Sequence, residues 1–316
     1  MLEISFGSFS YEKIIGQLDL ALDQLAHHDA DLDRFALMLV DNAVEIALHK
    51  HVGVSIFVNK NTQGDFKKEV RYAKKTKIIS PETEESINFL HKLRNSSYHR
   101  GLPYTGVIHS LTVFYFKIAC TLLQDHKPYS MSRDLELPYR AAKYLGDVPL
   151  PDPEKSCGYE EYFGVAWERL IKAADALRSD LLGDLVRDMS KTIDETDKEI
   201  ERFASFPNTG RKKALKRVRA TGLACSDEGE ERGIKLGFAE SEELADLGDL
   251  YGLIDFLMAK GEVSGSDPIP NWKNRLRSLE KEKAGKDLNA AIKKYFTFMQ
   301  DTESFRDAID LTSSGP

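Results

Sequence analysis

Cysteine is scarce in this chain, and its placement excludes two common kinds of small structural site. The three cysteines, Cys120, Cys157 and Cys225, lie far apart, and no Cys-x-x-Cys pair occurs. A disulfide scaffold needs more cysteines, and a zinc site needs them closely spaced. A glycine-rich phosphate loop is missing as well. We therefore expect no disulfide framework, no bound metal and no cofactor.

Long apolar runs are also missing. The most apolar stretch, residues 107–123, contains His109 and Lys117 and is shorter than the roughly 20 residues that a membrane-spanning helix needs. The opening segment MLEISFGSFSYEKII lacks the basic region and apolar run of a secretory leader. We expect a soluble, cytoplasmic protein with no membrane partner.

Proline and glycine are too few, at 11 and 21 of 316 residues, for a collagen-like or a Pro/Gly-rich disordered chain. Single cores stop growing at roughly 250–300 residues, so the length suggests one large or two medium domains. All eight histidines lie in the first 126 residues. Residues 1–150 hold 18 basic and 18 acidic residues, whereas residues 151–316 hold 26 and 33 and so carry the whole net charge of −7. We expect domains at 1–150 and 151–316, joined by a Pro- and Gly-containing linker at 145–158.

Helical periodicity dominates and predicts an all-α fold. In the first half, apolar residues recur at helical spacing in 11–25, 31–50 and 107–124, and Ser80-Pro81 followed by acidic residues predicts another helix start. Residues 52–58 fit either a strand or a continued helix. In the second half, helical patterns cover about 159–206, 241–260 and 272–299, whereas 207–231 interrupts them. The aromatic residues there, Trp272, Tyr295, Phe296 and Phe298, are typical of a core or an interface.

One short motif carries the elements of a chemical mechanism. Arg94 and Asn95 are followed by Ser-Ser-Tyr and then His99. A guanidinium binds phosphate oxygens through paired hydrogen bonds, and an imidazole exchanges protons near neutral pH. In a continuous helix the two side chains would lie about 140° apart around the axis. We therefore expect the turn-prone residues 95–97 to break the helix and bring Arg94 and His99 together. The alternative is a cation pair that caps the carbonyl groups at a helix end.

This motif resembles the Rx4-6H motif of HEPN domains, which are all-helical domains of bacterial and archaeal toxins, phage-defence ribonucleases and RNA-guided RNA nucleases. The resemblance covers about residues 10–130. It implies an antiparallel helical bundle, followed here by a C-terminal helical domain. It also implies a metal-independent endoribonuclease, a toxin or anti-phage effector, with Arg94, Asn95 and His99 as catalytic residues. Attack by the 2′-hydroxyl would give a 2′,3′-cyclic phosphate, with RNA as the substrate and tRNA as one candidate.

The same resemblance implies partners. HEPN ribonucleases typically pair two motifs across a homodimer, so we expect a composite active site. A toxin needs restraint, so we expect an antitoxin or a defence-system partner protein. Some HEPN toxins carry a tyrosine two residues after the histidine as the target of a nucleotidyltransferase. Gly101 stands at that position, so we do not expect this modification, although Tyr98 flanks the motif.

Further charged residues are candidates for supporting roles. Asp41 and Glu45 lie one helical turn apart, so one of them holds Arg94 in place or both are ordinary solvated carboxylates. His27 and His28 lie in an acidic loop and are expected at the surface. The remaining histidines of interest, His49, His51 and His109, are expected to be structural.

A basic island interrupts the acidic second half. Six of the nine residues from 211 to 219 are cations, and no acidic residue occurs from 203 to 226. The cations are Arg211, Lys212, Lys213, Lys216, Arg217 and Arg219. The island is typical of an RNA-backbone contact. It also fits a solvated face or an internal partner for the acidic residues 227–231, and its glycines fit a mobile loop. If it is helical, Leu215 and Val218 face inward.

Two other functions remain open. The HEPN-like domain could be a catalytically silent interaction or regulatory module. A DNA-binding regulator that uses residues 211–219 is a weaker third possibility, because the first half is formally neutral and the whole chain is acidic.

Overall fold

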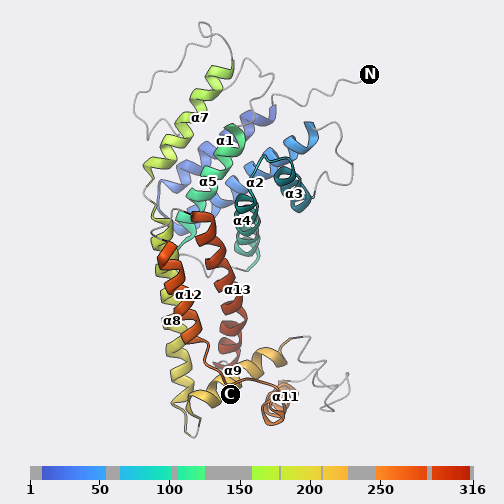
Figure 1. Ribbon diagram of the computed structural model, residues 1–316, viewed down its shortest axis with the longest axis vertical. Helices are drawn as coiled ribbons and strands as arrows, with labels where there is room; N and C mark the ends of the chain where they lie inside the picture. Colours follow the sequence, from blue (N-terminus) through green and yellow to red (C-terminus); the bar gives the residue numbers. More distant parts are fainter. Residues whose placement is uncertain are drawn as a thin grey trace. The chain divides into compact units, whose positions relative to one another are not determined.

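The computed structural model describes residues 9–54, 65–100, 106–124, 159–177, 179–207, 209–226, 247–282 and 287–313. All of its regular elements in these ranges are α-helices, which confirms the all-α prediction (Figure 1). They are α1 (Phe9–Leu25), α2 (Ala30–Val54), α3 (Phe66–Lys75), α4 (Pro81–Arg100), α5 (Ile108–Gln124), α7 (Tyr159–Ala176), α8 (Leu181–Ala204), α9 (Gly210–Ala224), α11 (Leu247–Lys260), α12 (Ile269–Glu282) and α13 (Leu288–Ser313).

The chain divides into two compact units. The first comprises residues 1–184 and 288–293, and the second comprises residues 185–287 and 294–316. This division differs from the predicted boundary at residues 150 and 151, because α7 packs against α1 and α5 in the first unit. The predicted linker at 145–158 lies outside the described residues.

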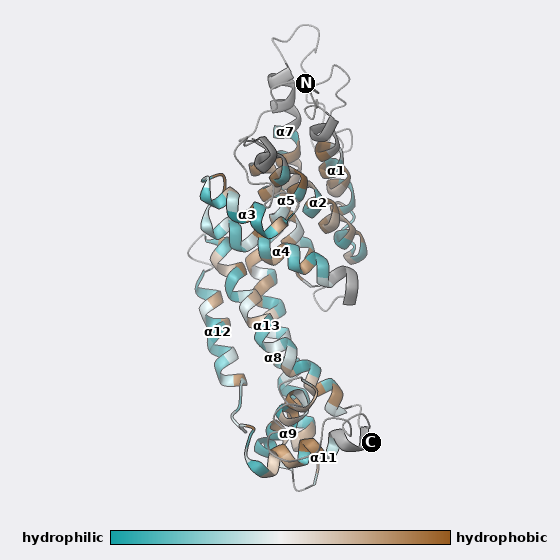
Figure 2. Cartoon of the chain, turned by 90° about the vertical axis from the view of Figure 1, so that its right-hand side faces the viewer, coloured by the Kyte–Doolittle hydropathy of each residue, from teal (hydrophilic) through white to brown (hydrophobic). Residues whose placement is uncertain are grey.

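Helix α2 is the centre of the first unit. It packs against α1, α3, α4 and α5, and its buried face includes Leu37, Val40 and Val44. Figure 2 shows the corresponding apolar colouring along α1, α2 and α5. The side chain of Asp29 caps α2 by accepting hydrogen bonds from the backbone N–H groups of residues 31 and 32 at 2.9 and 3.1 Å. Of the two structures that residues 52–58 fit, the helix continues as far as Val54, and residues 55–64 lie outside the described ranges.

Helix α4 begins as predicted but does not break as predicted. The Ser80 hydroxyl caps it by accepting a hydrogen bond from the Thr83 backbone N–H at 3.1 Å. The helix then runs without interruption to Arg100, so the expected break at residues 95–97 is wrong. Asn usually breaks helices because its side chain competes for backbone hydrogen bonds. Here the Asn95 amide contacts the side chains of His91 and Arg94 instead, which removes that competition.

In the second unit, the basic island forms helix α9 instead of an interruption or a mobile loop. Leu215 and Val218 are buried, as predicted for a helix at this position. Ala220 of α9 packs with Leu253 and Leu257 of α11 in one apolar cluster. Leu215 and Val218 are not part of this cluster, so apolar residues of α9 are buried both against α11 and elsewhere, and this burial stabilises a helix in a sequence so rich in cations.

Two predicted helical regions are divided in the structure. The region 159–206 forms α7 and α8, and Asp180 begins α8 by accepting a hydrogen bond from the backbone N–H of Gly183 at 3.1 Å. The region 272–299 forms parts of α12 and α13 on either side of residues 283–286. The aromatic residues Trp272, Tyr295, Phe296 and Phe298 are buried, so they belong to the core.

Among the helices of the described ranges, none combines the length and apolar content that crossing a membrane requires.

Candidate functional site

The site of the first unit is centred on a carboxylate that has no contact with solvent. The Asp41 side chain, on α2, is 0% exposed and faces α4 and α5. The Tyr115 hydroxyl of α5 donates a hydrogen bond to Asp41 Oδ1 at 2.8 Å. Removing a carboxylate from water costs several kcal/mol unless other groups hydrogen-bond to it. The side chains next to Asp41 must therefore supply hydrogen bonds or a positive charge to its carboxylate.

Arg94 supplies the compensating positive charge. Its Nε donates to Asp41 Oδ2 at 2.7 Å, and its Nη2 donates to Glu45 Oε1 at 3.1 Å. The predicted contact between Arg94 and a carboxylate of the earlier helix is therefore confirmed, and it involves both carboxylates. The alternative that Asp41 and Glu45 are ordinary solvated residues is wrong for Asp41, which is fully buried.

Asn95 determines how the next residue in the network is hydrogen-bonded. Its Oδ1 accepts a hydrogen bond from Arg94 Nη1 at 2.8 Å, so its amide nitrogen faces His91 Nε2 at 3.2 Å. An amide nitrogen only donates, so His91 Nε2 is the acceptor and Nδ1 carries the ring proton. That proton points at Asp41, whose two carboxylate oxygens lie 3.2 and 3.1 Å from Nδ1.

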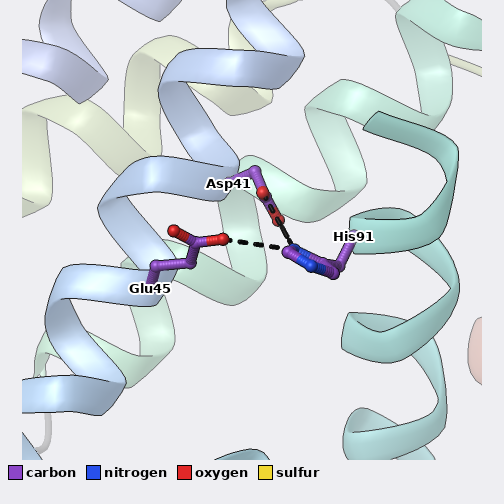
Figure 3. Close-up of side chains that lie close together, drawn as sticks. All are labelled: Asp41, Glu45 and His91. Atoms are coloured by element: carbon purple, nitrogen blue, oxygen red, sulfur yellow. Dashed lines mark hydrogen bonds and ion pairs between the residues drawn. The ribbon is translucent and has the colours of Figure 1, made fainter. Parts of the chain in front are cut away.

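The His91 ring is also held by stacking against one of its faces. The ring of Phe66, the first residue of α3, lies on the imidazole with a centroid distance of 3.9 Å and an interplanar angle of 23°. Figure 3 shows Asp41 and Glu45 projecting from α2 toward the same edge of the His91 ring on α4. Four helices thus contribute side chains to one cluster, which we call the Asp41 cluster: Asp41, Glu45, Phe66, His91, Arg94, Asn95 and Tyr115.

The electrostatics of the cluster shift two pKa values. Partial burial, and then the charge of Asp41, raise the pKa of Glu45 above its usual value, although Arg94 opposes this shift. Complete burial and the adjacent Asp41 carboxylate raise the pKa of the Tyr115 hydroxyl well above its usual value. Tyr115 is therefore a permanent hydrogen-bond donor in this site, and Glu45 takes up a proton more readily than an ordinary glutamate does.

Three residues of the cluster have the donor types of a metal site. Ligand atoms of Asp41, Glu45 and His91 lie within 4.8 Å of one another. However, the Arg94 guanidinium contacts both carboxylates, at the same Oδ2 and Oε1 atoms that approach His91. A divalent ion would have to displace this cation. The two carboxylates therefore already bind a cation, the guanidinium of Arg94.

Arg94 and Asn95 lie in this cluster, and for His99 and Tyr98 only the backbone is described. Because α4 is continuous, positions 94 and 99 of its backbone are separated by about 140° around the helix axis. The side chains of Tyr98 and His99 lie outside the described part of the molecule. Among the described side chains, the imidazole that shares a site with Arg94 is that of His91.

The importance of His91 and Tyr115 did not emerge from the sequence. For His91 a signal existed, because residues 91, 94 and 95 are spaced so that they share one helix face opposite the carboxylates of α2. For Tyr115 no local signal existed, since it is separated from Asp41 by 74 positions and lies in an apolar helix. His49 and His109 contact Glu69 and Asp33 at 2.9 Å each, and His27 and His28 are exposed, as expected. The side chain of His51 lies outside the described residues.

The basic island divides into engaged and exposed cations. Arg211 contacts Asp197, Glu201 and Asp267. The hydrogen bond that Arg211 donates to Asp267 is the largest cause of a pKa above the usual value of arginine. Arg219 donates to the carbonyl oxygen of Ser266 at 2.9 Å. Arg211 therefore has internal carboxylate partners, but the predicted partners at 227–231 lie outside the described ranges.

The other cations of the island remain on the surface. Lys212, Lys213 and Arg217 are exposed and Lys216 is half-buried, and none has a carboxylate partner within the described ranges. A Cβ atom at Gly265 would lie 2.9 Å from Lys212 Cγ, so this segment packs against the stem of that lysine. The predicted RNA-binding role therefore concerns chiefly Lys212, Lys213 and Arg217.

No protein family, curated protein or solved structure that we searched matches this chain.

Substituting Tyr115 by Phe tests the central hydrogen bond. The change removes one donor to a buried carboxylate, and hydrogen bonds to charged groups contribute about 1.5–3 kcal/mol. We expect the free energy of unfolding, measured by urea denaturation, to fall by about that amount. Tyr251→Phe, in a half-buried tyrosine of α11, is the matched control, with an expected effect within about 0.5 kcal/mol. Equal effects of the two substitutions would contradict the role of the Tyr115 hydroxyl.

Glu45→Gln tests the raised pKa of Glu45. A carboxyl whose folded-state pKa is raised stabilises the folded state at low pH and loses that contribution as pH rises. We expect wild-type stability relative to Glu45→Gln to fall as pH rises from about 4.5, the ordinary value, through the raised pKa. Denaturation curves of both proteins across acidic to neutral pH measure this difference. A difference that is constant with pH, or that increases with pH, would show that the pKa of Glu45 is not raised.

Proposed function

We propose that this protein is a metal-independent endoribonuclease of the HEPN type, with Arg94 as the phosphate-binding cation. The observation that carries the proposal is the position of the guanidinium. Asp41, Glu45 and Asn95 engage three of its N–H groups, of which a guanidinium has five. Two N–H groups are left without a partner in the described part of the chain, and the side chain is 27% exposed. A pre-oriented guanidinium is suited to the charge that develops on a phosphate during cleavage.

The proposed reaction requires only side chains and RNA. His99 accepts the proton of the 2′-hydroxyl, and the 2′-oxygen forms a bond to the adjacent phosphorus. The bond from phosphorus to the 5′-oxygen breaks, and the 5′-oxygen gains a proton from the imidazolium of His99. The products are a 2′,3′-cyclic phosphate and a 5′-hydroxyl. Arg94 stabilises the pentacoordinate phosphorus of the transition state through its remaining N–H groups. Asn95 fixes the orientation of the guanidinium.

The continuity of α4 supports a composite site in a homodimer. Positions 94 and 99 are about 140° apart around the axis of α4, so in this proposal Arg94 of one chain and His99 of its partner act on one phosphate. In the second unit, Lys212, Lys213 and Arg217 would contact the RNA backbone, with tRNA among the candidate substrates. An RNA-cleaving toxin or anti-phage effector of this kind would act in the cytoplasm, with an antitoxin or defence-system partner protein to restrain it.

A catalytically silent interaction module is the second candidate, and one observation favours it. With Glu45 ionised, the Asp41 cluster contains two carboxylates and one guanidinium, which gives one net negative charge. A negative cluster repels phosphate, whereas it is adequate for holding α2, α4 and α5 together. Cleavage assays separate the two candidates.

The cleavage test uses purified full-length protein, tRNA or total RNA, and EDTA. We expect cleavage with a cyclic phosphate end, and a loss of about 100-fold or more for Arg94→Lys and for His99→Ala. Arg94→Lys retains a cation beside Asp41, so it avoids an unpaired buried charge. His27→Ala is the matched control because His27 is exposed and outside the cluster. Activity that survives both substitutions, or that requires a divalent ion, rejects this mechanism, and no cleavage at all favours the silent module.

Mixed dimers test the composite site. Co-expressed Arg94→Lys and His99→Ala chains form dimers that retain one Arg94 and one His99 from different chains. Random pairing makes half of the dimers mixed, so we expect recovery of up to about a quarter of wild-type activity. If both residues of one chain act together, the mixture stays as inactive as either variant alone.

A further inference from the structure

A second group of cations lies beside the Asp41 cluster on α3. The segment from Lys67 to Lys77 contains six cations and one acidic residue. The acidic residue, Glu69, is buried and contacts His49, so it does not offset the exposed charge of this helix. Figure 2 shows α3 as predominantly hydrophilic. The exposed side of α3 is therefore positive in a half of the chain that is neutral overall.

The cations of α3 and α4 line one hollow of the first unit. The hollow has a volume of about 330 Å³ and is lined by Lys67, Arg71, Glu84, Glu85, Asn88, Phe89, Lys92 and Lys293. Lys74 contacts Glu84 at 2.6 Å and Lys293 contacts Glu85 at 2.9 Å, so both carboxylates are compensated. Lys67, Arg71 and Lys92 are exposed and have no carboxylate partner within the described ranges.

The hollow also contains an aromatic ring. Phe89 is half-buried, and the ammonium group of Lys92 lies 6.0 Å from the centre of its ring. A positively charged groove with an aromatic side chain is the arrangement that binds single-stranded nucleic acid, because cations contact the phosphates and bases stack on the ring. An acidic protein partner would need the cations but not the aromatic ring that lines the hollow.

The hollow and the Asp41 cluster are connected through α3 and α4. Phe66, which stacks on His91, precedes Lys67, and His91 precedes Lys92. On α4, residues 85, 88, 89 and 92 face the hollow, whereas residues 91, 94 and 95 face the cluster, so the two features occupy neighbouring sides of the same helix.

We propose that the hollow formed by Lys67, Arg71, Phe89 and Lys92 binds single-stranded RNA. This inference rests on the proposed ribonuclease function and adds the substrate-binding surface and the strandedness of the substrate. The three unpartnered cations also offset the net negative charge of the Asp41 cluster, which an approaching phosphate would otherwise meet. The preference for single strands follows from Phe89, since bases of a duplex are already stacked on each other.

The test measures RNA binding separately from cleavage. The probe is a fluorescent single-stranded oligonucleotide of 2′-O-methyl RNA, which lacks the attacking hydroxyl and cannot be cleaved. We expect the triple variant Lys67→Gln/Arg71→Gln/Lys92→Gln to bind about tenfold or more weakly than wild type at moderate salt. Each lost phosphate contact on a single strand reduces the slope of log Kd against log salt by about 0.7, so the slope should fall by about 2.

The matched control removes the same charge elsewhere. Lys172, Lys191 and Lys260 are exposed lysines on α7, α8 and α11, and the variant Lys172→Gln/Lys191→Gln/Lys260→Gln should bind as wild type does. Phe89→Leu keeps an apolar side chain but removes the stacking surface, and we expect binding about tenfold weaker. A duplex of the same sequence should be unaffected by Phe89→Leu.

The outcomes separate the two proposals. Equal binding by the triple variant and its matched control, or no binding of the probe by wild type, overturns the RNA-binding hollow even if the protein cleaves RNA. Loss of binding in the triple variant alone supports the hollow, also when wild type leaves ordinary RNA uncut. In that last case the ribonuclease proposal fails and the binding surface stands.

Discussion

The burial of the Asp41 charge is the constraint on which the polar interior of the first unit depends. An ionised carboxylate without water is costly, and apolar packing cannot compensate it because apolar groups supply neither hydrogen bonds nor an opposite charge. The compensation comes from Arg94 and His91 on α4 and from Tyr115 on α5. One charge on α2 therefore determines the relative positions of three helices, and a displacement of any of them would expose or isolate that charge. Arg94 is oriented for the same reason, whatever ligand it meets.

Local patterns in the sequence predicted the elements that local physics determines. The helices predicted from apolar periodicity at 11–25, 31–50 and 107–124 correspond to α1, α2 and α5, and the cap at Ser80 was confirmed because a cap depends on a few adjacent residues. The predictions failed where a distant contact outweighed local preference. Asn95 would favour a turn in isolation, but its amide is engaged by His91 and Arg94. The basic segment at 210–224 is a helix whose apolar residues are buried, some of them against α11, which is distant in sequence.

The candidate site shows the same division between local and distant information. The contact between Arg94 and the carboxylates of α2 was predictable because residues 41 and 45 share a helix face. The contribution of Tyr115 was not, since no pattern within α5 distinguishes that tyrosine from a core residue. The charged hollow was also missed, because its cations are divided between α3 and α4 and only their packing brings them together. The HEPN resemblance rests on the motif at 94–99, and the continuous helix through it makes the pairing of two chains the central question for catalysis.

The directionality of the network has an evolutionary consequence. Arginine only donates hydrogen bonds, so the Asn95 oxygen must accept, its nitrogen must donate, and His91 must accept at Nε2. An aspartate at position 95 could accept from Arg94 but would have no proton for His91. The identities of residues 91, 94 and 95 are thus mutually dependent, and related sequences should either keep all three or replace them together. An alignment in which position 95 varies freely while His91 and Arg94 are retained would contradict this coupling.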